Sequence, residues 1–220
     1  MKLTFITIFP GLVEDFCKEA LISRAIKNKK ILVKTISPRE FTTDVHQTVD
    51  DSPYGGGNCG MIMKAPPLIS AIRKATGRKK SADTLIILLT PSKKIFNQKM
   101  AVKFANKYKH IIFVCGRYEG MDARVEKFVD LKLSIGEFVL MGGEVAALAI
   151  LEATARLLPG VINHGESLIH EESYGQKFYL EYPKYTRPEV FEKMKVPKIL
   201  LSGHHAKIEE WRKGKSATKK

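Results

Sequence analysis

Two short apolar runs that open into glycine-rich segments constrain the fold of this chain more than any other feature. Residues 111–115 form an uninterrupted apolar run that predicts a buried strand, and glycines begin where it ends, within residues 115–120. Residues 131–135, Leu-Lys-Leu-Ser-Ile, also predict a strand and lead into residues 134–144, which hold three further glycines. Main-chain groups of such segments can approach a flat ligand without side chains in the way. The two runs therefore predict an α/β sheet that binds a small molecule at its strand ends.

Predicted strands and helices alternate along the first 160 residues. This alternation indicates a mostly parallel sheet that is flanked by helices on both faces. The chain has 220 residues, which is enough for one such α/β domain and a small second unit. The predicted strands are residues 2–9, 31–36, 85–89, 111–115 and 131–135; the predicted helices are residues 12–26, 95–108, 146–156 and a segment that follows Pro66 and Pro67.

The character of the sequence changes at Gly160. Residues 161–175 have neither a helical nor a strand period, which is typical of a linker. Beyond them, residues 188–194 and 204–212 predict short helices in a small C-terminal unit. The expected organisation is a first domain at residues 1–160, a linker at residues 161–175 and a small helical unit at residues 176–220.

The net charge of +14 predicts a polyanionic partner. The surplus is spread along the chain: residues 1–160 carry 25 Lys and Arg against 15 Asp and Glu, and residues 161–220 carry 12 against 8. A nucleic acid would match such a distribution. The alternative interpretation is that the charge only keeps the protein soluble.

Cysteine usage and hydropathy point to a cytoplasmic protein without membrane contact. Cys17, Cys59 and Cys115 show neither a C-x-x-C spacing nor a matching histidine cluster, so they predict a reducing compartment and no zinc site. The sequence begins on a strand-like run without a signal peptide, and no apolar stretch reaches the ~20 residues of a membrane helix.

The glycine runs belong to an ordered set of motifs that covers nearly the whole chain. The set resembles the bacterial tRNA (guanine-N1)-methyltransferases, the TrmD family, which are knotted SPOUT methyltransferases. One glycine motif alone would be weak support, whereas motifs in this order are specific. They are Val-Asp-Asp-Ser-Pro-Tyr-Gly-Gly-Gly at residues 49–57, Leu-Leu-Thr-Pro at 88–91, Arg-Leu-Leu-Pro-Gly at 156–160, Tyr-Thr-Arg-Pro at 185–188 and Leu-Ser-Gly-His-His-Ala at 201–206.

The resemblance implies a fold and an activity. The expected fold is α/β with a trefoil knot at the C-terminal end of the first domain. The expected activity is methyl transfer from S-adenosylmethionine to N1 of the guanosine immediately 3′ of the tRNA anticodon (position 37), which maintains the reading frame. The family is homodimeric, and each active site combines the donor pocket of one subunit with the linker and C-terminal unit of the other.

By resemblance, three segments at strand ends would hold the methyl donor. Their glycines expose main-chain groups for adenine recognition. Phe138 stands where the family often has tyrosine and keeps the stacking face without the hydroxyl. The alternative is that the glycines merely end the strands. The predicted donor residues are Leu89, Thr90, Pro91, Cys115, Gly116, Arg117, Tyr118, Glu119, Gly120, Ser134, Ile135, Gly136, Phe138, Leu140, Gly142 and Gly143.

Two residues match the catalytic positions of the family. Arg156 corresponds to the arginine that assists at guanine O6. Glu172 stands where the family has an aspartate as general base, and its stem is one methylene longer. Because a misplacement of about 1 Å can cost ~100-fold in rate, the position of this carboxylate matters. The alternative is that Glu172 is one solvated charge in a polar linker.

The resemblance also assigns a metal candidate and substrate contacts. Glu119 would hold the methionine amine or Mg²⁺, or it would simply pair with Arg117 or Arg124. Trp211 would contact tRNA or serve as a core anchor. The predicted substrate-binding residues are Asp50, Tyr54, Gly55, Gly56, Gly57, Arg187 and Trp211.

Two other functions remain compatible with these residues. One is a SPOUT methyltransferase for another RNA site, although residues 50–61 resemble the guanine-specific enzymes more than ribose-methylating ones. The other is an RNA-binding knotted protein with weakened catalysis. Glu172, a glycine loop one residue longer than usual and a C-terminal unit shorter than in the family would fit this second alternative.

Overall fold

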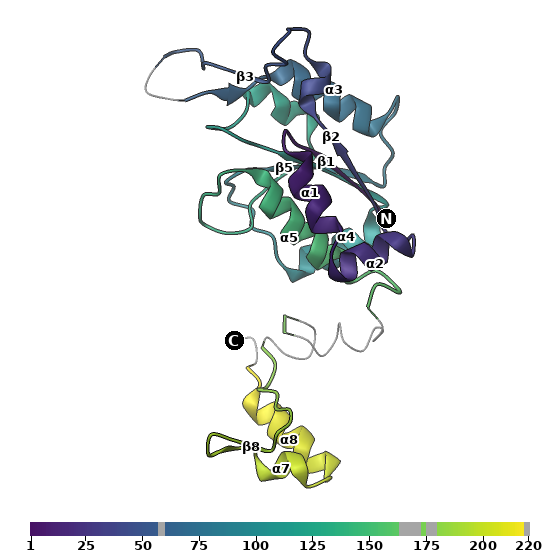
Figure 1. Cartoon of the computed structure of the whole chain (residues 1–220), viewed down its shortest axis with the longest axis vertical. Coiled ribbons are helices and arrows are strands. Elements are labelled where there is room, and N and C mark those ends of the chain that lie inside the picture. The colour runs from purple at the N-terminus through teal and green to yellow at the C-terminus, as the bar shows by residue number, and fades with distance from the viewer. Residues whose placement is uncertain (57–59, 163–172, 175–179, 218–220) are drawn as a thin grey trace. The chain divides into compact units, whose positions relative to one another are not determined.

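The chain forms two compact units, Met1–Asn163 and His164–Lys220. The computed structural model describes residues 1–56, 60–162, 173–174 and 180–217. Among the described residues, the first unit contains the sheet and most of the helices, and the second contains a short hairpin and two helices (Figure 1).

Five parallel strands form the sheet of the first unit, in the order β2-β1-β6-β5-β7. This confirms the predicted parallel sheet. The register places Leu89 of β5 beside Cys115 of β6 and Leu133 of β7, so the ends of these three strands meet at one edge of the sheet. The strands are β1 (Lys2–Ile6), β2 (Leu32–Ile36), β5 (Thr84–Leu89), β6 (His110–Cys115) and β7 (Leu131–Leu133).

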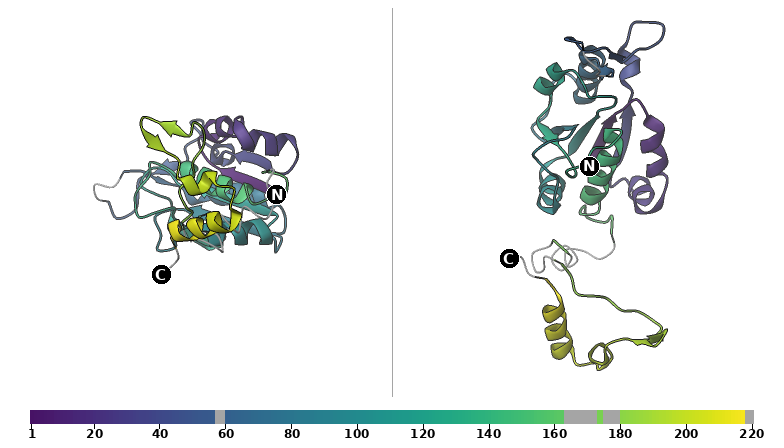
Figure 2. Two further views of the ribbon diagram at one scale, coloured as in Figure 1. Left: turned by 90° about the horizontal axis from the view of Figure 1, so that it is seen from below. Right: turned by 90° about the vertical axis from the view of Figure 1, so that its left-hand side faces the viewer.

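Helices cover both faces of the sheet, as Figure 2 shows, because the strands are apolar on both sides. In β6, Ile111 and Phe113 pack into one core and Ile112 and Val114 into the other. The first face is covered by α1 (Pro10–Cys17), α2 (Ala20–Lys27), α4 (Gln98–Lys107) and α5 (Gly143–Ala155); the second is covered by α3 (Ala65–Thr76) with the short 3-10 helices η1 (Pro38–Phe41) and η2 (Ala123–Phe128).

The predicted single helix at residues 12–26 is wrong. The structure has two helices there, because Glu19 is extended and Ala20 has a left-handed φ of 48°. The break lets α1 bury Val13 and α2 bury Ile22 in the same core. A helical period alone cannot reveal a turn between two amphipathic segments.

The helix predicted at residues 95–108 begins later, at Gln98. The Asn97 side chain accepts a hydrogen bond from the Met100 N–H and caps the helix. Ile95 instead forms a bridge with Ser134, and the Phe96 N–H donates to the Ser134 carbonyl. The segment after β5 therefore binds the end of β7 through main-chain contacts with Ser134.

The second unit is only partly helical. The helix predicted at residues 188–194 is wrong: β8 (Val190–Phe191) and β9 (Met194–Lys195) form a hairpin, with left-handed φ values at Glu192 and Lys193 in its turn. The helix predicted at residues 204–212 is confirmed as α8 (His205–Lys215), and a short helix, α7 (Lys198–Leu201), precedes it.

Candidate functional site

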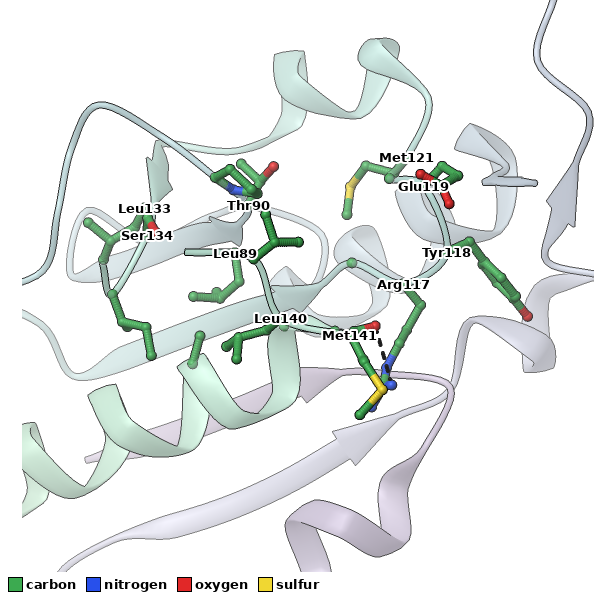
Figure 3. Close-up of a pocket in the computed structure, with 18 of the residues that line it drawn as sticks. Leu89, Thr90, Arg117, Tyr118, Glu119, Met121, Leu133, Ser134, Leu140 and Met141 are labelled. Atoms are coloured by element: carbon green, nitrogen blue, oxygen red, sulfur yellow. Dashed lines mark hydrogen bonds between the residues drawn. The ribbon is translucent and has the colours of Figure 1, made fainter. Parts of the chain in front are cut away.

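A pocket of about 210 Å³ lies where β5, β6 and β7 end (Figure 3). We call it the strand-end pocket. It is lined by residues of the three predicted segments. The first of these segments ends more than 40 residues before the last begins. All the predicted donor residues except Cys115 and Gly136 line it.

Cys115 and Gly136 lie next to the strand-end pocket without lining it. The Cys115 side chain is fully buried in the core, and burial raises the pKa of its thiol well above the usual value. At Gly136, a Cβ would lie 2.2 Å from the Phe138 ring, so the absence of a side chain lets this ring fold over the turn. Sequence reasoning missed five lining residues, of which two lie inside a predicted segment. The five are Met121, Leu133, Val139, Met141 and Ala146.

Gly143 lets the start of α5 pack directly on the end of β6. Its N–H donates to the Gly116 carbonyl at 2.9 Å. A Cβ on Gly143 would lie 2.9 Å from the Cys115 Cα and 3.0 Å from the Leu89 Cβ, and backbone atoms cannot move aside as a flexible side chain can. Position 143 therefore requires glycine, because the start of α5 lies too close to the ends of β5 and β6 for a side chain.

A buried ion pair joins the two glycine segments. Arg117 donates from Nε to one oxygen of the Glu144 carboxylate at 2.8 Å, and the Thr7 hydroxyl donates to the other at 2.6 Å. Glu144 has no exposed surface, and the Arg117 side chain is 18% exposed. The Arg117 guanidinium also lies over the Phe9 ring, 4.6 Å from its centroid. Sequence reasoning missed Glu144 and Thr7.

The alternative in which Glu119 pairs with a neighbouring arginine is wrong for the described residues. Arg117 pairs with Glu144, and Arg124 pairs with Asp122 through several hydrogen bonds that lower the pKa of the Asp122 carboxyl. Glu119 lines the strand-end pocket, and its Cγ lies 3.2 Å from where a Cβ on Gly60 would be. Its carboxylate is therefore available to a ligand in the pocket.

Carboxylate, histidine and cysteine side chains of the described residues are the possible ligands for a metal ion. In the described ranges, no group of three or more His, Cys, Asp or Glu residues could hold an ion. Among the described lining residues, Glu119 is the one carboxylate. A Mg²⁺ ion, which prefers oxygen ligands and usually keeps several waters, would find a single carboxylate among the described lining residues.

The loop predicted to bind substrate lies beside the strand-end pocket. It extends from a hairpin of β3 (Asp50–Asp51) and β4 (Ile62–Met63), in which Asp50 pairs with Met63. The Met63 N–H donates to the Gly120 carbonyl at 2.9 Å, and the Asp122 N–H donates to the Met63 carbonyl at 2.9 Å. These bonds tie the base of the hairpin to the pocket. Of the predicted tip residues, Tyr54, Gly55 and Gly56 are exposed, and Gly57 lies outside the described residues.

The whole chain matches one protein family. The pattern that defines the family described as tRNA (Guanine-1)-methyltransferase TrmD matches residues 1–220. The chain belongs to the TrmD family.

Individual TrmD-family proteins are similar to the chain over almost its full length. A tRNA (guanine-N(1)-)-methyltransferase from Ureaplasma parvum is 44% identical over 218 residues, covering 99% of this chain and 92% of that protein. One from Thermus thermophilus is 47% identical over 213 residues, covering 97% and 85%. The solved structure of tRNA (m1G37) methyltransferase from Aquifex aeolicus superimposes with a TM-score of 0.79 at 36% identity, covering 97% of this chain and 88% of that one.

The predicted catalytic residue Arg156 does not line the strand-end pocket of this TrmD-family chain. Gly143, at the start of α5, lines the pocket, whereas Arg156 caps the other end of that helix. A helix rises 1.5 Å per residue, so Arg156 lies about 20 Å from Gly143. Glu172 lies outside the described residues.

The two predicted tRNA contacts of the second unit lie in different settings. Arg187 is exposed. Trp211 is half-buried on α8, with the rings of Tyr182 and Tyr185 each 6.4 Å away between centroids. This packing matches the alternative in which Trp211 anchors the small unit.

Proposed function

We propose that the protein transfers a methyl group from S-adenosylmethionine to N1 of the guanosine immediately 3′ of the tRNA anticodon, at position 37. Membership of the TrmD family over the whole chain carries this proposal. The curated relatives are named tRNA (guanine-N(1)-)-methyltransferases, and the Aquifex aeolicus protein is named a tRNA (m1G37) methyltransferase. The net charge of +14 suits a tRNA partner.

The strand-end pocket has the chemistry that S-adenosylmethionine requires. Leu89, Ile135 and Leu140 provide apolar walls for an adenine ring, and the glycines expose main-chain groups for its polar edge. Glu119 offers a negative charge to the positively charged methionine end or to Mg²⁺. When bound, this cofactor supplies an electrophilic methyl group.

The protein's own residues would then manage the proton and charge of guanine. N1 carries a proton, so methyl transfer needs a base beside it. We assign this base to Glu172 and the stabilisation of negative charge on O6 to Arg156. Glutamate has the same carboxylate as the family's aspartate, and the linker has to accommodate its extra methylene.

A homodimer would complete this site. Arg156 lies at the far end of α5 from the strand-end pocket of its own unit, so a second copy is the natural source of the arginine. Exposed apolar side chains on α1 and around the start of α5 support such an interface, among them Leu12, Met141 and Val145. Met141 is 91% exposed and belongs to a run of exposed apolar side chains that includes Val139, and such contiguous patches are typical of interfaces.

Family membership supports the remaining expectations. These are a trefoil knot in the first unit, a cytoplasmic location, and tRNA contacts by the β3–β4 loop and by Arg187 and Trp211. Within the described part of the chain, no helix combines the length and apolar character needed to cross a membrane.

Methyl transfer from labelled S-adenosylmethionine to a tRNA transcript tests this function. The transcript with guanosine at position 37 should be methylated, the one with adenosine there should not, and Glu172→Gln and Arg156→Ala proteins should lose transfer. Transfer that is equal on both transcripts would favour another RNA site. Donor binding without any transfer would favour an RNA-binding protein that has lost catalysis.

A further inference from the structure

A second groove lies between α3 and η2. These two elements cover the face of the sheet opposite α5, and Figure 1 labels α3 and α5. It has a volume of about 460 Å³. Pro66, Ile69 and Phe128 provide its apolar surface, and three cations, Arg73, Arg124 and Lys127, border it. We call it the α3–η2 groove.

The carboxylates around the α3–η2 groove are already neutralised. Asp122 pairs with Arg124, Glu126 pairs with Lys132 at 2.9 Å, and Asp130 pairs with Lys80. These pairs leave the remaining cations of the groove without an opposite charge, so the surface is locally positive.

Two of the groove's cations stay available to a ligand. Arg73 and Lys127 are both exposed, and neither forms a salt bridge with any residue that the structure describes. The Arg73 guanidinium lies over the Phe128 ring, 5.4 Å from its centroid, which orients it without neutralising it. Lys74, Arg78 and Lys79, all exposed, extend the positive charge beyond the groove along the chain.

The two walls of the α3–η2 groove directly follow, along the chain, the β3–β4 hairpin and the strand-end pocket. The hairpin strand β4 runs into α3 within two residues, and the strand-end pocket residue Met121 leads into η2 through Asp122. The bonds between Met63 and Gly120 and between Asp122 and Met63 hold these segments together. A long substrate that is bound at the hairpin can therefore extend along the same pair of segments.

We propose that the α3–η2 groove binds the phosphodiester backbone of the tRNA substrate, as a contact separate from the methyl-donor pocket. This inference rests on the proposed function. Guanidinium and ammonium groups are the usual partners of phosphate, and the apolar floor suits the flat sides of sugars and bases. A second copy of this chain fits poorly, because the same groove on both subunits would bring like charges together.

Neutralising the two available cations tests the contact. In the Arg73→Gln/Lys127→Gln protein we expect tRNA affinity to fall by about tenfold at moderate salt and the slope of log affinity against log salt to fall by about 1–2. Affinity for S-adenosylmethionine should not change. The matched control is Lys99→Gln/Lys103→Gln, which removes two exposed charges from α4 on the opposite face of the sheet.

The control separates this inference from the proposed function. If the control protein methylates guanosine-37 tRNA normally, the function holds, and unchanged tRNA affinity in the Arg73→Gln/Lys127→Gln protein would overturn the groove contact alone. An equal loss in both proteins would also overturn it, because net charge would then account for the effect.

A cross-link gives a readout that does not depend on removing charge. A photoreactive benzoylphenylalanine in place of Ser70, which lines the groove, should form an adduct with tRNA upon irradiation. The same residue in place of Lys103 on α4 should not. Adducts with a second copy of the chain in place of tRNA, or no adduct at Ser70, would contradict the proposal.

Discussion

Arg117 and Glu144 form a buried ion pair that joins the loop after β6 to the start of α5. The pair lies against the strand-end pocket, because Arg117 lines the pocket and Gly142 and Gly143 directly precede Glu144. Thr7, at the end of β1, completes the network from the other side. The geometry of the pocket therefore depends on a carboxylate that does not itself line it.

Replacing Glu144 with glutamine should destabilise the protein by about 3 kcal/mol, because it leaves the Arg117 charge partly buried without its partner. S-adenosylmethionine should also bind more weakly, since the Arg117 side chain is no longer fixed. Urea unfolding and calorimetric titration measure the two effects. Thr7→Val removes one hydrogen bond to the same carboxylate and should cost less, about 1–2 kcal/mol. A Glu144→Gln protein as stable as the wild type would contradict the structural role of the pair.

Adding one methyl group at Gly143 should damage the strand-end pocket. In Gly143→Ala the new Cβ meets the Cys115 backbone and the Leu89 Cβ, so α5 has to move away from β6, at a cost of about 1–3 kcal/mol. We expect affinity for S-adenosylmethionine to fall by at least about tenfold, which corresponds to 1.4 kcal/mol. The control is Gly11→Ala on α1, where a Cβ meets nothing within 4 Å. Equal donor affinity in the two variants would show that the close approach at Gly143 is unimportant.

Two variants that are each inactive, at a donor concentration too low to fill the Gly143→Ala pocket, should restore each other's activity if the active site is shared between subunits. In a dimer of one Arg156→Ala chain and one Gly143→Ala chain, one of the two sites combines an intact pocket with an intact arginine. Random assortment of equal amounts should therefore recover about a quarter of the wild-type activity. Methyl transfer after co-refolding measures it. If each chain used its own Arg156, no mixture would regain activity.

The stability of the first unit should fall on acidification because of His110. Burial, together with the nearby Lys2, lowers the pKa of His110 to about 4, and Asp83 opposes this shift only partly. The unfolded side chain titrates near pH 6.5 and so binds more protons than the folded one between these values. This contribution to stability is present above about pH 6.5 and is lost as the pH falls towards 4.

Urea midpoints at pH 7 and pH 5 check this expectation. The wild-type midpoint should be lower at pH 5, and the difference should shrink in His110→Gln, whose amide can still bond to Thr4 as His110 does at 2.9 Å. An identical pH dependence in both proteins would mean that other groups control acid stability.

Local sequence patterns were sufficient for the sheet, and the resemblance to the TrmD family added most residues of the strand-end pocket. Strands such as β5 and β6 are apolar throughout, and this pattern reports burial on both faces. The glycines that follow them mark strand ends, and parallel strands bring these ends to one edge of the sheet. Errors arose in short segments: residues 12–26 contain a turn, and residues 188–194 form a hairpin. The helical period of residues 12–26 does not reveal the turn between two helices, and residues 188–194 are too few to fix a period.

The sequence by itself determined the parallel sheet, because apolar runs and the glycines after them are patterns within short stretches of chain. It also determined the family through motifs in a fixed order along the whole chain, and the resemblance to that family indicated the three segments that form the strand-end pocket. The tertiary structure alone decided which charges meet. Thr7 reaches Glu144 across 137 positions because β1 lies beside β6 in the sheet. The tertiary structure also decided that Arg156 lies at the end of α5 that is far from the strand-end pocket. Such relationships follow from strand order and helix length in space, which no local pattern contains.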